Sequence, residues 1–92
     1  MMRSETNVAI PPGVSIKEQL ERHNMTQKEF AIRMGYSEKH ISHLLNGKNE
    51  LSYETVLKLE KVLGIPAKVW KRKEARYREQ LERVKDDLQN VN

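Results

Sequence analysis

The sequence contains no cysteine, and this absence removes several classes of protein at once. Without cysteine there is no disulfide framework, no thiolate zinc site and no thiol nucleophile. A chain that needs no disulfide suits a reducing compartment. We therefore expect the protein to work in the cytoplasm.

Long hydrophobic runs are also missing. The longest local apolar cluster, Val8 to Ile10, stops at two prolines. It is far shorter than the roughly 20 apolar residues that span a bilayer, and shorter than the core of a signal peptide. The sequence predicts a soluble, unexported protein with no membrane partner.

Signatures of catalysis are absent as well. The sequence has no glycine-rich phosphate loop and no nucleophile with a recognisable base. His40 and His43 are three residues apart, a spacing that can serve a metal, but no cysteine or third clustered histidine completes a site. We expect no enzyme, no metal and no cofactor, and therefore a binding module.

What the sequence does contain bounds the fold and the partner. A chain of 92 residues with 37% hydrophobic residues can bury one small core but not two, so one domain is expected. Seventeen Lys and Arg against thirteen Asp and Glu give a formal net charge of +4. This charge suits an anionic partner such as nucleic acid, although many solvated helical proteins are equally basic.

The N-terminal region reads as an arm that leads into a helix. Residues 1–13 are mostly polar and end in two prolines and a glycine, which predicts a flexible arm. Ser15 and Glu18 form an S-x-x-E capping pair for a first helix. Asn24, a residue type that tolerates a left-handed backbone, marks its end.

Two short helices follow, separated by a tight glycine turn. Thr26 and Glu29 repeat the capping pair for the second helix, and Gly35 ends it. Ser37 caps the third helix and Gly47 closes it. This arrangement lets the later helix enter a DNA groove. The apolar residues expected in the core are Phe30, Ala31 and Met34 in the second helix and Ile41, Leu44 and Leu45 in the third.

Two further helices complete the prediction. Ser52 caps the fourth helix. The fifth helix should run from Pro66 to about Asn90, because the N–H at the first position of a helix has no partner within the helix and proline lacks this N–H. We predict an all-α, five-helix fold with a helix-turn-helix domain over residues 14–70 and an extended C-terminal helix over 71–92. The residues of the fourth helix that should point toward the core are Val56, Leu57, Leu59, Val62 and Leu63.

The fifth helix carries an apolar stripe with three-four spacing that starts at Trp70. Either its first residues complete the monomer's core while the rest is a solvated tail, or the stripe binds a second copy, a partner protein or a following domain. Residues 71–78 hold five bases and one acid, whereas 79–92 hold two bases and four acids. We assign to a dimer or partner interface the residues Tyr77, Leu81, Val84 and Leu88.

The third helix has the features of a recognition helix. Opposite its apolar face it presents Glu38, Lys39, Ser42 and His43, which could meet base edges in a major groove. Lysine can donate to guanine O6 and N7, and histidine can donate or accept according to its tautomer. Glu38 could accept from a cytosine amino group, or simply stabilise the first turn of the helix.

Contacts to the phosphate backbone are expected around both short helices. The exposed N–H groups at the start of the second helix suit phosphate, and Lys48 and Asn49, just beyond the third helix, can reach an adjacent phosphate. The predicted phosphate-contacting residues are Gln27, Lys28, Ser37, Asn46, Lys48 and Asn49.

These motifs together resemble the Cro/C1-type (XRE) helix-turn-helix family, which has a lambda-repressor-like fold. The resemblance covers Pro12 to Tyr77, and within the family the chain looks most like the HigA-type antitoxins. The segments that carry it are Pro12-Gly13, Gln27, Ala31, Gly35, Ser37, His40-Ile41-Ser42, Leu45-Asn46-Gly47-Lys48, Leu63-Gly64 and Trp70. The antitoxin likeness rests on Pro12-Gly13, on Lys39-His40-Ile41-Ser42 and on Trp70 followed by Tyr77.

The resemblance implies a repressor that binds double-stranded operator DNA as a homodimer. For a HigA-type protein it further implies a partner toxin, typically an mRNA-cutting ribonuclease, and repression of the protein's own operon. It also implies that Glu38 stands at a base-reading position that is often an amide in related repressors. Two alternatives stay open: the front piece of a larger regulator with a zinc metallopeptidase module, and a toxin-binding protein whose helix-turn-helix scaffold does not bind DNA.

Overall fold

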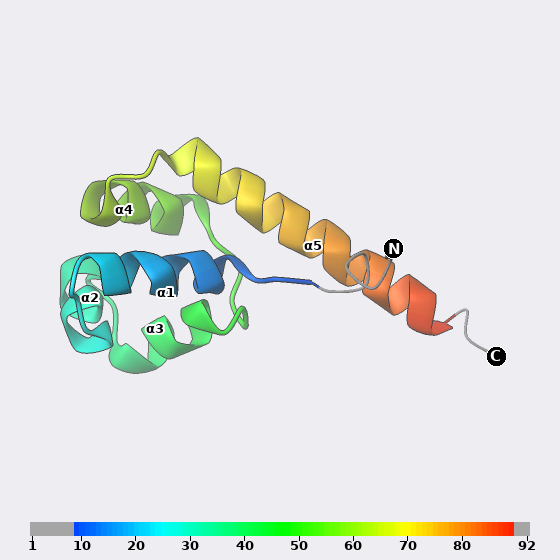
Figure 1. Ribbon diagram of the computed structural model, residues 1–92, viewed down its shortest axis with the longest axis horizontal. Helices are drawn as coiled ribbons and strands as arrows, with labels where there is room; N and C mark the ends of the chain where they lie inside the picture. The colour runs from blue at the N-terminus through cyan, green and yellow to red at the C-terminus, as the bar shows by residue number, and fades with distance from the viewer. Residues whose placement is uncertain (1–8, 90–92) are drawn as a thin grey trace.

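The computed structural model describes residues 9–89, and over this range the chain forms five α-helices and no strand. The helices are α1 (Pro12–Arg22), α2 (Gln27–Met34), α3 (Glu38–Leu45), α4 (Tyr53–Leu63) and α5 (Ala67–Gln89). Helices α1 to α4 gather into one group, and the second half of α5 projects beyond it (Figure 1). The predicted all-α, five-helix fold with a long last helix is confirmed.

All five helices contribute to one hydrophobic core. Its largest fully buried side chain is Trp70 on α5, so the first turn of that helix belongs to the domain. In the short helices α2 and α3, the residues that their spacing predicts to face the core are buried. Full burial of a large apolar side chain contributes about 1.5–3 kcal/mol. The core cluster is Ile16, Leu20, Phe30, Ala31, Met34, Ile41, Leu44, Leu45, Leu51, Val56, Leu59, Leu63 and Trp70.

Three helices begin at the caps that the sequence predicts. In α2, the Glu29 N–H donates to the Thr26 hydroxyl and the Thr26 N–H donates to the Glu29 carboxylate, both at 3.0 Å. The Ser37 hydroxyl accepts from the third residue of α3 at 3.0 Å, and the Ser52 hydroxyl does the same for α4 at 3.2 Å. Gly35 ends α2 in the left-handed conformation, with φ of 76°.

The start of α1 differs from the prediction. Its first residue is Pro12, with Pro11 at the N-cap, so Ser15 lies inside the helix and the predicted Ser15–Glu18 cap was wrong. Proline fits a first helical position because its missing N–H would have no helical partner there. Pro12 and Gly13 are buried and are not part of the arm. Of the expected arm, residues 1–8 lie outside the described residues.

Gly13, in the first turn of α1, lies against the end of α3. A Cβ atom built at this glycine would lie 1.8 Å from the backbone oxygen of Leu45, so α1 packs directly on the end of α3. Only a residue without a side chain permits this approach. The position of α3 in the domain therefore depends on a glycine in α1.

Two smaller expectations were also wrong. Helix α5 begins at Ala67, and Pro66 precedes it, with its carbonyl accepting from the Val69 N–H at 3.0 Å. Leu57 is 40% exposed, because α4 faces the core along a line through Val56 and Leu59, and Leu57 lies off that line. The last three residues of the chain fall outside the described range.

Replacing Gly13 by Ala should lower the free energy of unfolding by about 1–3 kcal/mol, because the new methyl group forces α1 away from α3. Urea denaturation measures this change. Glu18→Ala, at an exposed position of the same helix, is the control and should change stability by less than about 0.5 kcal/mol. If both variants unfold like the wild type, the α1–α3 approach is looser than the structure indicates.

Candidate nucleic-acid interface

Helices α2 and α3 form a helix-turn-helix. The connection between them is Gly35–Ser37, in which the Gly35 N–H donates to the Ile32 carbonyl at 3.2 Å and the Tyr36 N–H to the Ala31 carbonyl at 3.0 Å. These bonds fix the path of the turn, and the Ser37 cap then sets the start of α3. The angle between the two helices is thereby determined within three residues.

One face of α3 is buried and the opposite face is open. Ile41, Leu44 and Leu45 are at most 2% exposed and pack into the core. A helix of 3.6 residues per turn then places the four predicted base-contacting residues together on the other side. Of these, Glu38 and Lys39 are exposed, and Ser42 and His43 are half-buried. The sequence prediction of one shared face agrees with the geometry.

The predicted phosphate-contacting residues lie at the ends of α2 and α3. Gln27 and Lys28 are exposed in the first turn of α2. Ser37 caps the start of α3 with its oxygen, which leaves its O–H free to donate. Beyond the other end of α3, Lys48 is exposed and Asn49 is half-buried, while Asn46 is the exposed C-cap.

The charges on this surface are not engaged with the protein itself. Within residues 9–89, Lys39 and Lys48 form no ion pair or side-chain hydrogen bond, and neither does Glu38. Glu38 lies in the first turn of α3, where the helix dipole favours a negative charge. Two lysines and one glutamate are therefore available to an incoming ligand.

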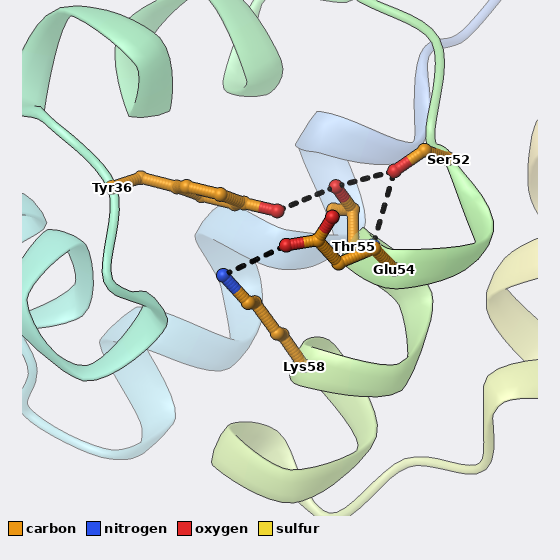
Figure 2. A network of polar contacts seen from close by, with 5 residues as sticks. All are labelled: Tyr36, Ser52, Glu54, Thr55 and Lys58. Atoms are coloured by element: carbon orange, nitrogen blue, oxygen red, sulfur yellow. Dashed lines mark hydrogen bonds and ion pairs between the residues drawn. The ribbon is translucent and has the colours of Figure 1, made fainter.

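A contact that the sequence did not reveal joins the turn to α4. The Tyr36 side chain reaches across to the start of α4, where its hydroxyl lies 2.9 Å from the Thr55 hydroxyl, which is in turn 3.0 Å from the Ser52 cap (Figure 2). Lys58 lies over the Tyr36 ring at 4.2 Å from its centre and pairs with Glu54 at 3.3 Å. Tyr36 thus links the turn to the helix that follows α3.

His40 packs against the same ring. Its imidazole stacks on Tyr36 with centroids 4.1 Å apart and the planes 5° from parallel. This position turns His40 toward the turn and away from the open face of α3. No group of three or more His, Cys, Asp or Glu side chains suited to a metal ion occurs within residues 9–89.

The fifth helix requires one correction. Tyr77, assigned from the sequence to a dimer or partner interface, is only 9% exposed and is packed within its own chain. Leu81 and Val84 are half-buried, and Leu88 is 70% exposed. The part of the stripe that remains open therefore begins one turn later than expected.

The chain before α1 runs beside this part of α5 (Figure 1). The Ile10 N–H donates to the Gln80 side chain at 3.4 Å, and the Ile10 side chain is 56% exposed. The arm therefore meets α5 at Gln80, one residue before Leu81, where the open part of the stripe begins. None of the helices within residues 9–89 is long and apolar enough to cross a membrane.

The fold and this interface define a helix-turn-helix protein. Residues 16–70, more than half of the chain, match the sequence profile of the helix-turn-helix family. The chain belongs to this family, which confirms the resemblance predicted from its motifs.

The proteins to which the chain is similar include a curated regulator and a solved antidote protein. An uncharacterised HTH-type transcriptional regulator, YddM, from Escherichia coli strain K12 is 37% identical over 59 residues, which are 64% of this chain and 63% of that protein. The chain thus spans slightly less than two thirds of this curated relative. The structure of an addiction module antidote protein of a HigA family from Coxiella burnetii matches with a TM-score of 0.75 at 22% identity, covering 91% of this chain and 96% of that one. The likeness to HigA proteins holds at the level of the fold.

Replacing Tyr36 by Phe should lower the free energy of unfolding by about 0.5–1.5 kcal/mol, the usual net value of one hydrogen bond. Thr55 keeps its bond to Ser52, so no buried group is orphaned. Thermal unfolding measures the loss. Tyr53→Phe, at a tyrosine that is 68% exposed, is the matched control and should leave stability within about 0.5 kcal/mol of the wild type. Equal effects of the two variants would remove the Tyr36–Thr55 bond as a stabilising contact.

Proposed function

We propose that this protein is a transcriptional repressor that binds operator DNA through α3. The observation that carries the proposal is the open face of α3, where Lys39 and His43 stand opposite a fully buried apolar face. Such a helix, held by the core and free on its outer side, fits the major groove of B-DNA. The protein has the role of a binding module in the cytoplasm and catalyses no reaction.

Sequence is read by Lys39 and His43, and Glu38 and Ser42 complete the base-contacting set. Lys39 suits guanine O6 and N7, and Glu38 suits the amino group of cytosine. Phosphate contacts come from the ends of α2 and α3. Because phosphate contacts position a protein without specifying sequence, these two groups of residues should respond differently to mutation.

A single recognition helix makes few base contacts, so we propose that the protein acts as a homodimer on two half-sites about one helical turn apart. The open part of the α5 stripe supports this, since Leu81, Val84 and Leu88 lie on one side of a helix that projects from the domain (Figure 1). An amphipathic helix of this kind is stabilised when its apolar side is covered.

We further propose that the protein is the antitoxin of a HigBA-like module and represses its own operon. The likeness in fold to an addiction module antidote protein of a HigA family supports this. A ribonuclease toxin would then be its protein partner, with the exposed Ile10 and the end of α5 as the surface it meets. A ribonuclease-like reading frame beside the gene would support the antitoxin role, whereas an in-frame peptidase module downstream would replace it with the larger regulator.

One observation favours a second candidate. Glu38 places a negative charge at the start of the recognition helix, where it would approach phosphates unless it meets a base or a cation. A toxin-binding protein on a helix-turn-helix scaffold that no longer binds DNA would tolerate this residue. A mobility shift on the region upstream of the gene, repeated at several salt concentrations, separates the two candidates.

Replacing Lys39 or His43 by Ala should weaken binding to operator DNA by about 1–3 kcal/mol and weaken binding to random DNA much less. The mobility shift is measured on both duplexes. Lys61→Ala, on an exposed residue of the last turn of α4, is the control for loss of one positive charge and should affect both duplexes equally and slightly. Equal losses on operator and random DNA would refute base reading by these two side chains.

Changing Leu81 and Leu88 together to Ser should lower the sedimentation mass and the cooperativity of operator binding. Each large side chain buried in the dimer contributes about 1.5–3 kcal/mol, which is enough to shift a modest dimer toward monomer. The thermal transition of the domain should change little, because the buried residues of α5 end at Tyr77, before Leu81 and Leu88. Leu57→Ser, on a partly exposed leucine of α4, is the control and should keep the dimer. A double variant that keeps its mass would place the dimer contact on other helices.

A further inference from the structure

The loop between α3 and α4 is held from two directions. On the α3 side, the Lys48 N–H donates to the His43 carbonyl at 2.9 Å, which extends the end of the helix as far as this lysine. Asn49 lies beyond that bond. Its carbonyl accepts a long hydrogen bond, 3.4 Å, from the guanidinium of Arg78 on α5. The loop is thus tied to a helix 29 residues further along the chain.

Arg78 is itself held in place. Its Nε donates to the Glu74 carboxylate at 2.7 Å, and the two side chains are 33% and 10% exposed. The guanidinium also lies over the Tyr77 ring, 4.8 Å from its centre. A guanidinium presents several donors in a rigid planar fork, so one group can serve the carboxylate of α5 and the carbonyl of the loop together. A charge-assisted hydrogen bond between partly buried groups is stronger than a neutral one.

Tyr77 closes on the same loop. A Cβ atom built at Gly47 would lie 3.0 Å from the Tyr77 hydroxyl and 2.8 Å from the side chain of Pro11, and Gly47 has a φ of 74°. The loop therefore passes between α5 and the chain that leads into α1, with no room for a side chain. Glu74, Tyr77 and Arg78 are called the α5 clamp below.

We propose that Arg78 is a positioning residue for DNA binding: the α5 clamp holds the loop so that Lys48 and Asn49 meet the phosphate backbone, and Arg78 does not touch the DNA. The inference rests on the proposed DNA-binding function. A loop that is already ordered loses less conformational entropy when it binds, so the clamp raises affinity for every sequence. Affinity for DNA thus also depends on Arg78, a residue of α5 that lies on neither helix of the helix-turn-helix.

A double-mutant cycle on random-sequence duplex DNA tests the coupling. Arg78→Gln should weaken binding about five- to tenfold, the equivalent of one lost hydrogen bond. Lys48→Ala should lower the slope of log affinity against log salt by about one unit. In the double variant, the added loss from Lys48→Ala should be less than about twofold, because without the clamp the Lys48 contact is already lost.

Arg76→Gln is the matched control. It removes the same charge from an exposed residue of α5, two positions away, whose side chain forms no ion pair or hydrogen bond within residues 9–89. Its affinity should stay within about twofold of the wild type. Amide hydrogen exchange at residues 49–51 gives a readout without DNA, and exchange there should speed up in Arg78→Gln and not in Arg76→Gln.

The outcomes distinguish this inference from the function on which it rests. Additive losses in the cycle would mean that Arg78 contacts DNA directly and would overturn its positioning role. Equal behaviour of Arg78→Gln and Arg76→Gln, in binding and in exchange, would overturn it as well. An unchanged salt slope in Lys48→Ala would remove the loop from the DNA, so the proposed phosphate contact and the positioning role would fail together.

Discussion

The stability of α3 depends on the rest of the domain. A helix of eight residues has almost no stability of its own in water, because nucleation is costly and few hydrogen bonds repay it. It forms here because Ile41, Leu44 and Leu45 are buried against the other helices. Burial of this face fixes the opposite face in space. The interface that we propose for DNA is therefore a consequence of core packing, and it loses its geometry when the core is loosened.

Three contacts refine how α3 is held, and each uses a different kind of interaction. The glycine in α1 lets the helix backbones approach directly at Leu45. Tyr36 ties the start of α3 to α4 through the Thr55 hydroxyl. Arg78 ties the loop after α3 to α5. The start, the end and the following loop of the recognition helix are thus fixed by three separate helices.

Local signals in the sequence were sufficient to predict much of this structure. The caps at Thr26, Ser37 and Ser52 depend on residues three positions apart, so the sequence alone predicts them. Ser15 carried the same signal and was misleading, because the Pro12–Gly13 pair starts the helix earlier and a capping pattern cannot show how closely another helix will pack. The predicted all-α fold was correct because five apolar periodicities pointed to it independently.

The errors and omissions in the site share one physical origin. The bond between Tyr36 and Thr55 spans 19 residues, and that between Arg78 and Asn49 spans 29, so neither appears as a local pattern. Tyr77 was misassigned because a helical stripe predicts which side is apolar and does not predict where the covering helices end. The only sign of the Tyr36–Thr55 contact in the sequence was the presence of an aromatic residue, Tyr36, between Gly35 and Ser37 in the turn.

The stripe on α5 shows how one periodic pattern can serve two purposes. Trp70 is fully buried, Tyr77 is 9% exposed, and Leu88 is 70% exposed, although all three belong to the same amphipathic side. The sequence period does not change along the helix; what changes is the presence of α1 and α4 beside it (Figure 1). The first half of α5 is therefore part of the core and of the clamp on the loop that follows α3. The second half keeps the same apolar side with less cover, because Leu81 and Val84 are half-buried and Leu88 is exposed, and Arg78 lies at the boundary between the two halves.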